Sequence, residues 1–236
     1  MDTQKHISSA FDQDLTTLND ALQKLGDLAC WQFEGAIEGI GTQNEADLDR
    51  VINGDAALDA LEAEINAKVI EVITLRSPRA EDLRYVLVAL KVATILERMG
   101  DYARNIANRT KVIMTAGNEN IPGVNIGRMG QVTQEMVRDA MKSYQNRNAE
   151  MALAVWRRDI EVDHMHTAFY KEVLASMSRN PNMVGTGAHL LFIAKNIERI
   201  GDYATGIAEQ VHFLVEGAVP DENRPKADKT SKVVNT

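Results

Sequence analysis

Several pairs of acidic residues in this sequence have three residues between their two members, and four of these pairs are candidates for metal binding. Residues i and i+4 lie on the same face of an α-helix, so each pair would present two neighbouring carboxylates. Two like charges at this spacing repel by a few tenths of a kcal/mol unless a cation lies between them. Clusters of carboxylate oxygens suit Mg²⁺, Mn²⁺ or iron. The candidate metal ligands are Asp55 and Asp59, Glu97 and Asp101, Asp159 and Asp163, and Glu198 and Asp202.

Two of these pairs belong to a stretch that the sequence contains twice. Residues Glu97–Ala107 recur as Glu198–Ala208, 101 residues later, and eight of the eleven positions are identical. A glycine, Gly100 or Gly201, stands between the two acids. Glycine inside a helix costs about 1 kcal/mol relative to alanine, and the close approach of a neighbouring helix or an ion is one reason to tolerate it. The duplication makes chance a poor explanation of the acidic pairs.

The acidic pairs also have explanations that need no metal. A single i,i+4 acidic pair usually belongs to a solvated helix face. Arg98 and Arg199 stand beside the acids and could neutralise them. Gly206 occupies the place where the first copy has Asn105, so a ligand role for that position would be unequal between the copies. A metal-free helical scaffold therefore remains an alternative, and the pairs could meet within a repeat or across repeats.

Histidine suggests a competing site. Glu161 with His164, and Glu209 with His212, have the Glu-x-x-His spacing of di-iron carboxylate enzymes in helical bundles. The first half of the chain has no such spacing, and a ferritin-like site needs two further glutamates on separate helices. A di-iron enzyme is an alternative on these grounds, whereas His164 and His166 are interpreted as surface residues.

Composition argues against several classes of function. A formal net charge of −8 argues against binding to nucleic acid or anionic lipid and permits cation binding. The single cysteine, Cys30, has apolar neighbours and is expected to be a packed thiol in a reducing compartment. The polar N-terminus and the lack of a membrane-length apolar run indicate a cytoplasmic protein. No Gly-Lys-Ser/Thr phosphate loop and no nucleophile with an identifiable base is present, so we expect no enzyme.

Long helices must position the acidic pairs. Apolar residues recur at three- and four-residue steps along most of the chain, and few aromatics or prolines interrupt them. Prolines after Ser77 and Asn180 break the pattern at matching places in the two halves. The pattern predicts an all-α fold of six long helices in two tandem three-helix bundles. The predicted divisions are a first repeat over 8–116, a linker over 117–126, a second repeat over 127–218 and a polar, disordered tail over 219–236.

The doubled motif Glu-Arg-(Ile/Met)-Gly-Asp-Tyr-Ala-x-x-Ile-Ala in an all-helical chain resembles the PhoU family of phosphate-uptake regulators, also called phosphate-specific transport system accessory proteins. The resemblance extends from about Asp14 to Val215 and includes the acidic pairs and Asp82–Arg84. It implies two PhoU-type three-helix bundles, usually dimeric, with a non-enzymatic role. That role is to repress the phosphate-starvation response by joining a phosphate ABC transporter, through its ATPase, to a membrane-bound sensor histidine kinase, and to limit phosphate uptake.

The resemblance also implies metal ions at the acidic pairs, as iron, zinc, manganese or magnesium. Glu97, Asp101, Glu198 and Asp202 match the family's metal ligands in the motif copies, with the aspartate pairs of the preceding helices as their partners. It implies a homodimer that reaches the membrane only through protein partners. Asn108 stands where the second copy has Glu209, which adds to the differences between the two expected sites.

Overall fold

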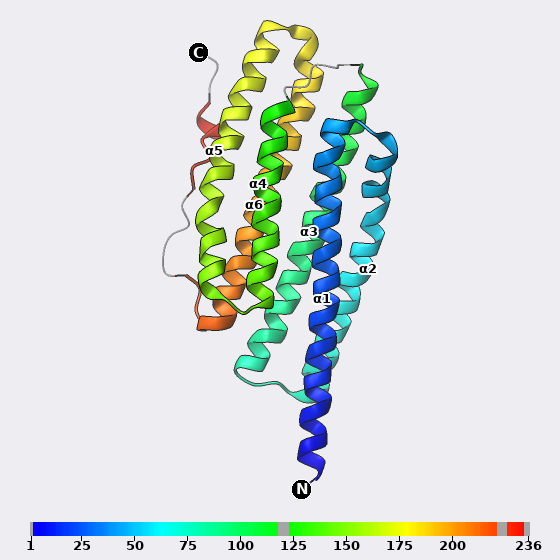
Figure 1. The fold of residues 1–236 in the computed structure, drawn as a ribbon, viewed down its shortest axis with the longest axis vertical. Helices are drawn as coiled ribbons and strands as arrows, with labels where there is room; N and C mark the ends of the chain where they lie inside the picture. The colour runs from blue at the N-terminus through cyan, green and yellow to red at the C-terminus, as the bar shows by residue number, and fades with distance from the viewer. Residues whose placement is uncertain (1, 118–122, 221–225, 234–236) are drawn as a thin grey trace.

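The computed structural model describes residues 2–117, 123–220 and 226–233, and long α-helices make up most of them. No strand occurs in these described ranges. Figure 1 shows the helices running up and down the long axis of the molecule, with the start of α1 extending beyond the bundle. The α-helices are α1 (Asp2–Thr42), α2 (Glu45–Arg76), α3 (Glu81–Thr115), α4 (Gly123–Gln145), α5 (Ala149–Arg179) and α6 (Val184–Glu216).

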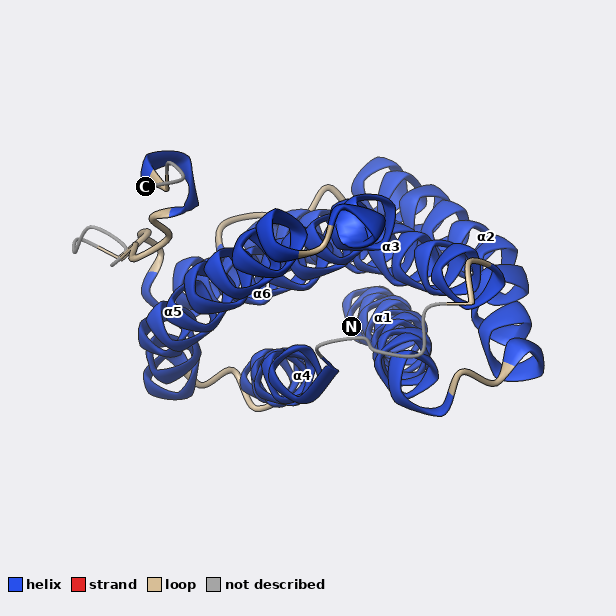
Figure 2. Cartoon of the chain, turned by 90° about the horizontal axis from the view of Figure 1, so that it is seen from above, coloured by secondary structure: helices blue, strands red, loops and turns tan. Residues whose placement is uncertain are grey.

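The helices form two layers (Figure 2). One layer contains α2, α3, α6 and α5 in that order, and the other contains α1 and α4. Each half of the chain is a three-helix bundle, because α1 packs on α2 and α3 while α4 packs on α5 and α6. The two bundles meet where α3 packs on α6 and α1 on α4. The prediction of two tandem three-helix bundles is confirmed, and all four helices that carry acidic pairs lie in one layer.

Local sequence signals account for several helix ends. The Asn44 side chain accepts a hydrogen bond from the N–H of Ala46 at the start of α2, and Asn148 accepts one from Met151 at the start of α5. Such caps satisfy N–H groups that have no partner within the helix. α2 ends at Arg76, and the C-cap residue Ser77, directly before a proline, has a left-handed backbone (φ 47°). These ends therefore follow from residues within one turn of each break.

The motif copies lie on the two central helices. The apolar runs before them bury side chains such as Val92 and Leu96 on α3 and Ile193 and Ile197 on α6. The motif tyrosines, Tyr102 and Tyr203, face each other across the contact between the repeats, with ring centroids 5.8 Å apart. None of the described helices is long and apolar enough to cross a membrane. The core thus continues from one repeat into the other.

The structure differs from the predicted divisions at the start of each repeat and in the tail. α1 begins at Asp2, six residues before the predicted first repeat, and α4 begins at Gly123, inside the predicted linker. Residues 118–122, 221–225 and 234–236, parts of the predicted linker and tail, lie outside the described residues. The expectation of a disordered tail is not met over 226–233, where Ala227 is buried and a short 3-10 helix, η2 (Thr230–Lys232), contacts α5.

Candidate functional site

The structure brings the acidic pairs together within each repeat, because α2 packs on α3 and α5 packs on α6. We call Asp55, Asp59, Glu97 and Asp101 the first acidic cluster, and Asp159, Asp163, Glu198 and Asp202 the second acidic cluster. Carboxylates of α2 and α3 act on one another electrostatically, as do those along α6. The question of pairing within or across repeats, which the sequence left open, is answered here by helix packing.

An arginine bridges the two helices of the first acidic cluster. Arg104, one turn after Asp101 on α3, forms ion pairs with Asp55 on α2 and with Asp101, the latter at 2.6 Å. Asp55 is buried, and burial is the main cause that raises the pKa of its carboxyl. Arg104 lowers that pKa, while the carboxylates of Asp59 and Asp101 raise it. The guanidinium thus offsets the repulsion among these acids.

Glu97 occupies the more crowded part of the first acidic cluster. Burial raises the pKa of Glu97, and the carboxylates of Asp101, Asp59 and Glu62 raise it further. Glu62 was not a sequence candidate, although it lies at i+3 from Asp59 on the same helix face. Its carboxylate accepts a hydrogen bond from the Thr94 hydroxyl on α3 at 3.1 Å. The first acidic cluster therefore contains five carboxylates once this neighbour is included.

The second acidic cluster is more deeply buried. Asp159, Asp163 and Glu198 are 2%, 3% and 6% exposed. Burial raises the pKa of Glu198, which the nearby ammonium of Lys195, 2.7 Å from its Oε2, opposes. The Asp163 carboxylate accepts a hydrogen bond of 2.6 Å from the backbone N–H of Ala227. A lysine and a backbone donor from the C-terminal segment thus compensate two of these buried charges.

The motif glycines have different surroundings. A Cβ atom on Gly100 would overlap the side chain of Leu58 on α2 and lie 2.8 Å from Oε1 of Gln32 on α1. Close helix approach, one of the two explanations given for this glycine, is therefore confirmed in the first repeat. A Cβ atom on Gly201 would meet its nearest neighbours at ordinary contact distances, 3.5 Å from Val162 and 3.6 Å from Oδ1 of Asp159. Packing alone does not require a glycine there.

The structure differs in two respects from what the sequence suggested for the histidines and their neighbouring glutamates. Glu209 accepts a hydrogen bond of 3.2 Å from the indole N–H of Trp156, while His212 contacts the carbonyl oxygen of Ala218 at 2.9 Å. His164 is exposed, as expected. The interpretation of His166 as a surface residue is wrong, because its side chain faces the α5–α6 contact and is 2% exposed. Residues two positions apart point to roughly opposite sides of a helix, and here the side of His166 is buried while that of His164 is exposed.

The donor chemistry of both clusters fits a metal ion, with one difference between them. The first acidic cluster offers only oxygen atoms, which suit hard cations. Within the described part of the chain, one group of His, Cys, Asp and Glu brings three ligand atoms within 4.8 Å of one another, and it lies at the second cluster. That group is His166, Glu198 and Asp228. Cationic side chains, Arg104 and Lys195, now lie among the carboxylates that an ion would join.

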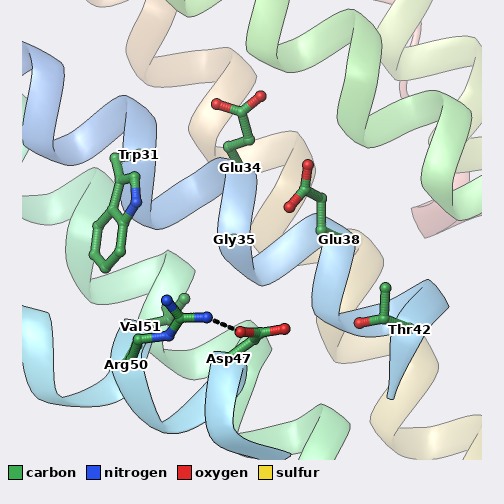
Figure 3. A pocket seen from close by; sticks show the side chains of 8 residues that line it. All are labelled: Trp31, Glu34, Gly35, Glu38, Thr42, Asp47, Arg50 and Val51. Atoms are coloured by element: carbon green, nitrogen blue, oxygen red, sulfur yellow. Dashed lines mark hydrogen bonds and ion pairs between the residues drawn. The ribbon is translucent and has the colours of Figure 1, made fainter. Parts of the chain in front are cut away.

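A separate pocket of about 330 Å³ lies between the end of α1 and the first turns of α2 (Figure 3). Glu34, Glu38 and Asp47 contribute carboxylates to its lining. Glu34 pairs with Arg138 at 2.9 Å, and Asp47 pairs with Arg50, as the dashed line in Figure 3 marks. Ion pairs with this much solvent contact are worth no more than about 1 kcal/mol. We assign no function to this pocket.

Comparison with known proteins identifies the family. The family model for the PhoU domain matches residues 22–110 and 126–211. A protein of Caulobacter vibrioides named phosphate-specific transport system accessory protein PhoU homolog is 36% identical over 97% of this chain and 99% of its own length. A protein of the same name from Xylella fastidiosa strain Temecula1 is also 36% identical, over 97% of this chain and 94% of its own length.

Solved structures agree with this result. The crystal structure of PhoU from Pseudomonas aeruginosa superimposes with a TM-score of 0.86 at 27% identity, and the match covers 88% of this chain and 100% of that chain. The phosphate transport system regulatory protein PhoU from Streptococcus pneumoniae has the same fold, with a TM-score of 0.83 at 24% identity over 90% of this chain and 100% of that chain. The domain is matched once in each three-helix bundle, and the chain belongs to the PhoU family.

Proposed function

We propose that this protein is a metal-binding, non-enzymatic negative regulator of phosphate uptake and of phosphate-starvation signalling. It acts by contact with the ATPase of a phosphate ABC transporter and with a sensor histidine kinase. The observation that carries the proposal is the match to proteins named phosphate-specific transport system accessory proteins over 97% of the chain. A net charge of −8 is compatible with docking on basic protein surfaces and disfavours direct binding to nucleic acid.

The metal-binding part rests on the two acidic clusters. In the first cluster carboxylates of two packed helices act on one another, and in the second three carboxylates are buried on two packed helices. Such groups repel one another unless a cation is present. Iron, zinc, manganese or magnesium would bind Asp55, Asp59, Glu97 and Asp101 in the first cluster and Asp159, Asp163, Glu198 and Asp202 in the second. The bound ion would supply positive charge between neighbouring helices, and these side chains would hold the helices in one register. We also propose a cytoplasmic homodimer that reaches the membrane only through its partners.

A phosphate-dependent reporter tests the regulatory role. Deletion of the gene should raise reporter output in phosphate-rich medium, and the wild-type chain should restore repression. An unchanged reporter after deletion would count against the regulatory role. The Asp101→Ala/Asp202→Ala double variant tests whether the acidic clusters contribute, with the exposed Asp20→Asn as a control for protein level and charge.

Elemental analysis separates the metal-binding proposal from a metal-free scaffold. Protein purified without chelators should contain a divalent or ferric metal, and Asp101→Ala/Asp202→Ala should contain less of it. Equal, negligible metal in both proteins would favour the scaffold. The di-iron alternative has no geometric support in the described residues, since Glu161, Glu209 and His212 contact other groups and His164 is exposed.

A further inference from the structure

The C-terminal segment 226–233 lies against the second acidic cluster and brings a third kind of ligand to it. His166 comes from α5, Glu198 from α6 and Asp228 from this segment. One ligand atom of each lies within 4.8 Å of the other two. The residues His166 and Glu198 are 2% and 6% exposed and Asp228 is partly buried, so the group is unlike a patch of acids on a solvated surface.

An unpartnered nitrogen points to a missing ligand. The buried Nδ1 of His166 has no hydrogen-bond partner in the structure, and the nearest carboxylate oxygen, Oδ2 of Asp228, is 3.6 Å away. A buried polar atom without a partner is destabilising, because it has lost its hydrogen bonds to water. Ring nitrogens of this kind are the commonest metal ligands in proteins, and an ion here would use the nitrogen that the fold leaves unbonded.

Backbone hydrogen bonds anchor the segment, so its position does not depend on Asp228 alone. The N–H of Ala227 donates to Oδ2 of Asp163 at 2.6 Å, and the N–H of Lys229 donates to the Thr167 hydroxyl at 3.1 Å. Oδ1 of Asp228 accepts from the N–H of Thr230 at 2.9 Å. This local bond leaves Oδ2 of Asp228 as the atom that faces His166.

The ammonium group of Lys195 occupies a position between two of these carboxylates, where a metal ion could also bind. Nζ of Lys195 lies 2.7 Å from Oε2 of Glu198 and 3.6 Å from Oδ2 of Asp228. Its side chain is 39% exposed on a flexible stem and can turn into water when a metal ion takes its place. A pocket of about 300 Å³, lined by His166, Lys195 and Thr230 together with mainly apolar side chains, lies beside the group.

We propose that His166, Glu198 and Asp228 form a transition-metal site that the C-terminal segment closes. One imidazole nitrogen and two carboxylates suit Zn²⁺, Fe²⁺ or Mn²⁺ better than Mg²⁺ or Ca²⁺, which prefer oxygen alone. Binding would exchange the ammonium of Lys195 for the metal and would fix the segment on α5 and α6. The site shares Glu198 with the second acidic cluster, but two of its three ligands lie outside the acidic pairs and it does not depend on the regulatory role.

The test uses the full-length chain, stripped of metal, and Zn²⁺ as the probe. A nitroxide attached at the exposed position 231 by Ser231→Cys, in a Cys30→Ser background, reports the mobility of the segment by electron paramagnetic resonance. Zn²⁺ should immobilise the label further, and the concentration dependence gives the affinity. Asp228→Asn should weaken this response at least about tenfold, because it removes a ligand from a position outside the helices. The charge-matched control Asp20→Asn should leave it unchanged.

Lys195→Met distinguishes a metal site from a simple ion-paired dock. In the proposed site, loss of the competing ammonium tightens Zn²⁺ binding by up to about fivefold. If Lys195 is only the partner of Asp228, the variant frees the segment and Zn²⁺ does not restore it. That outcome, or a wild-type response in Asp228→Asn, would overturn the proposal. The label reports neither phosphate signalling nor the first acidic cluster, so its result is separable from the reporter assay.

Discussion

The two acidic clusters contain the same pairs of acids, but the cationic side chain that pairs with them follows the motif acids in one repeat and precedes them in the other. In the first repeat Arg104 follows the motif acids and bridges α3 to α2, whereas the second repeat has Thr205 at that place. In the second repeat Lys195 precedes the acids and contacts Glu198, whereas the first repeat has Thr94. Each group of repelling carboxylates is thus paired with a cationic side chain, which stands at a different position relative to the acids in each repeat.

The neighbouring position on the preceding helix differs in the same sense. His166 stands where the first repeat has Glu62, because 104 residues separate the two positions as they separate Asp55 from Asp159. The candidate ligand atoms of the first cluster are therefore all oxygens, while the second has an imidazole nitrogen and the C-terminal segment beside it. Equal acidic pairs do not make equal sites, since the chemistry depends on residues within about one turn of the acids, and these differ between the repeats.

The largest expected difference between the repeats comes from the motif glycines. Gly100→Ala should destabilise the protein by about 1–3 kcal/mol, because the added methyl group overlaps the buried Leu58. Gly201→Ala meets only ordinary contacts and should be neutral or stabilise by up to about 1 kcal/mol through helix propensity. Urea unfolding of the two variants measures both effects.

A second substitution tests whether the overlap with Leu58 causes the loss of stability in Gly100→Ala. Leu58→Val should cost less in the Gly100→Ala background than in the wild type, because it makes room for the methyl group. Equal losses from Gly100→Ala and Gly201→Ala would mean that the two glycines serve the same purpose, contrary to the packing described.

The next effect concerns the bridging arginine. Arg104→Met leaves the buried Asp55 without its cation and should cost about 1–2 kcal/mol, between the values for exposed and buried ion pairs. Mn²⁺ should stabilise this variant more than the wild type, because the guanidinium no longer competes for the carboxylates. Thermal unfolding with and without Mn²⁺ measures both changes.

The control for Arg104 is its neighbour in the motif. Arg98→Met removes an exposed arginine that contacts the Tyr203 hydroxyl, and it should change stability by less than about 0.5 kcal/mol. If both variants lose the same stability, general charge and not the bridge between α2 and α3 explains the result.

The smallest effect is a pH dependence of the metal-free protein. The pKa of Glu97 and that of Glu198 are raised in the folded state, mainly by burial. At a pH between the ordinary and the raised pKa, each carboxyl is therefore protonated in the folded protein and ionised in the unfolded chain. The ionised carboxylates therefore lower stability at neutral pH, and this cost disappears as the pH falls through the raised pKa toward the ordinary value of 4.5. Glu97→Gln and Glu198→Gln should stabilise at pH 7 and gain less at pH 5.

Thermal unfolding across this range, in the presence of a chelator, provides the measurement. A gain that is independent of pH would show that the substitutions act through packing. Because Lys195 opposes the shift at Glu198, the comparison of the two variants also reports how far Lys195 compensates the charge of Glu198.

The fold was predictable because helix signals are local. Asn44 and Asn148 cap the helices that were expected to follow them, and Ser77 and Asn180 end helices before proline, all within one turn of each boundary. The acidic pairs and their duplication were likewise visible, since i and i+4 are neighbours on any helix. These local signals did not show which side chain on another helix each residue contacts.

The sequence by itself determined the six helices, the two repeats and the faces on which the eight candidate acids lie. Tertiary structure alone decided that the pairs meet within each repeat, that Arg104 reaches Asp55 across 49 positions of sequence, and that the C-terminal segment covers His166. The physical reason is range: backbone hydrogen bonds and caps act within a few residues, whereas burial and ion pairing between helices depend on how the whole bundle packs.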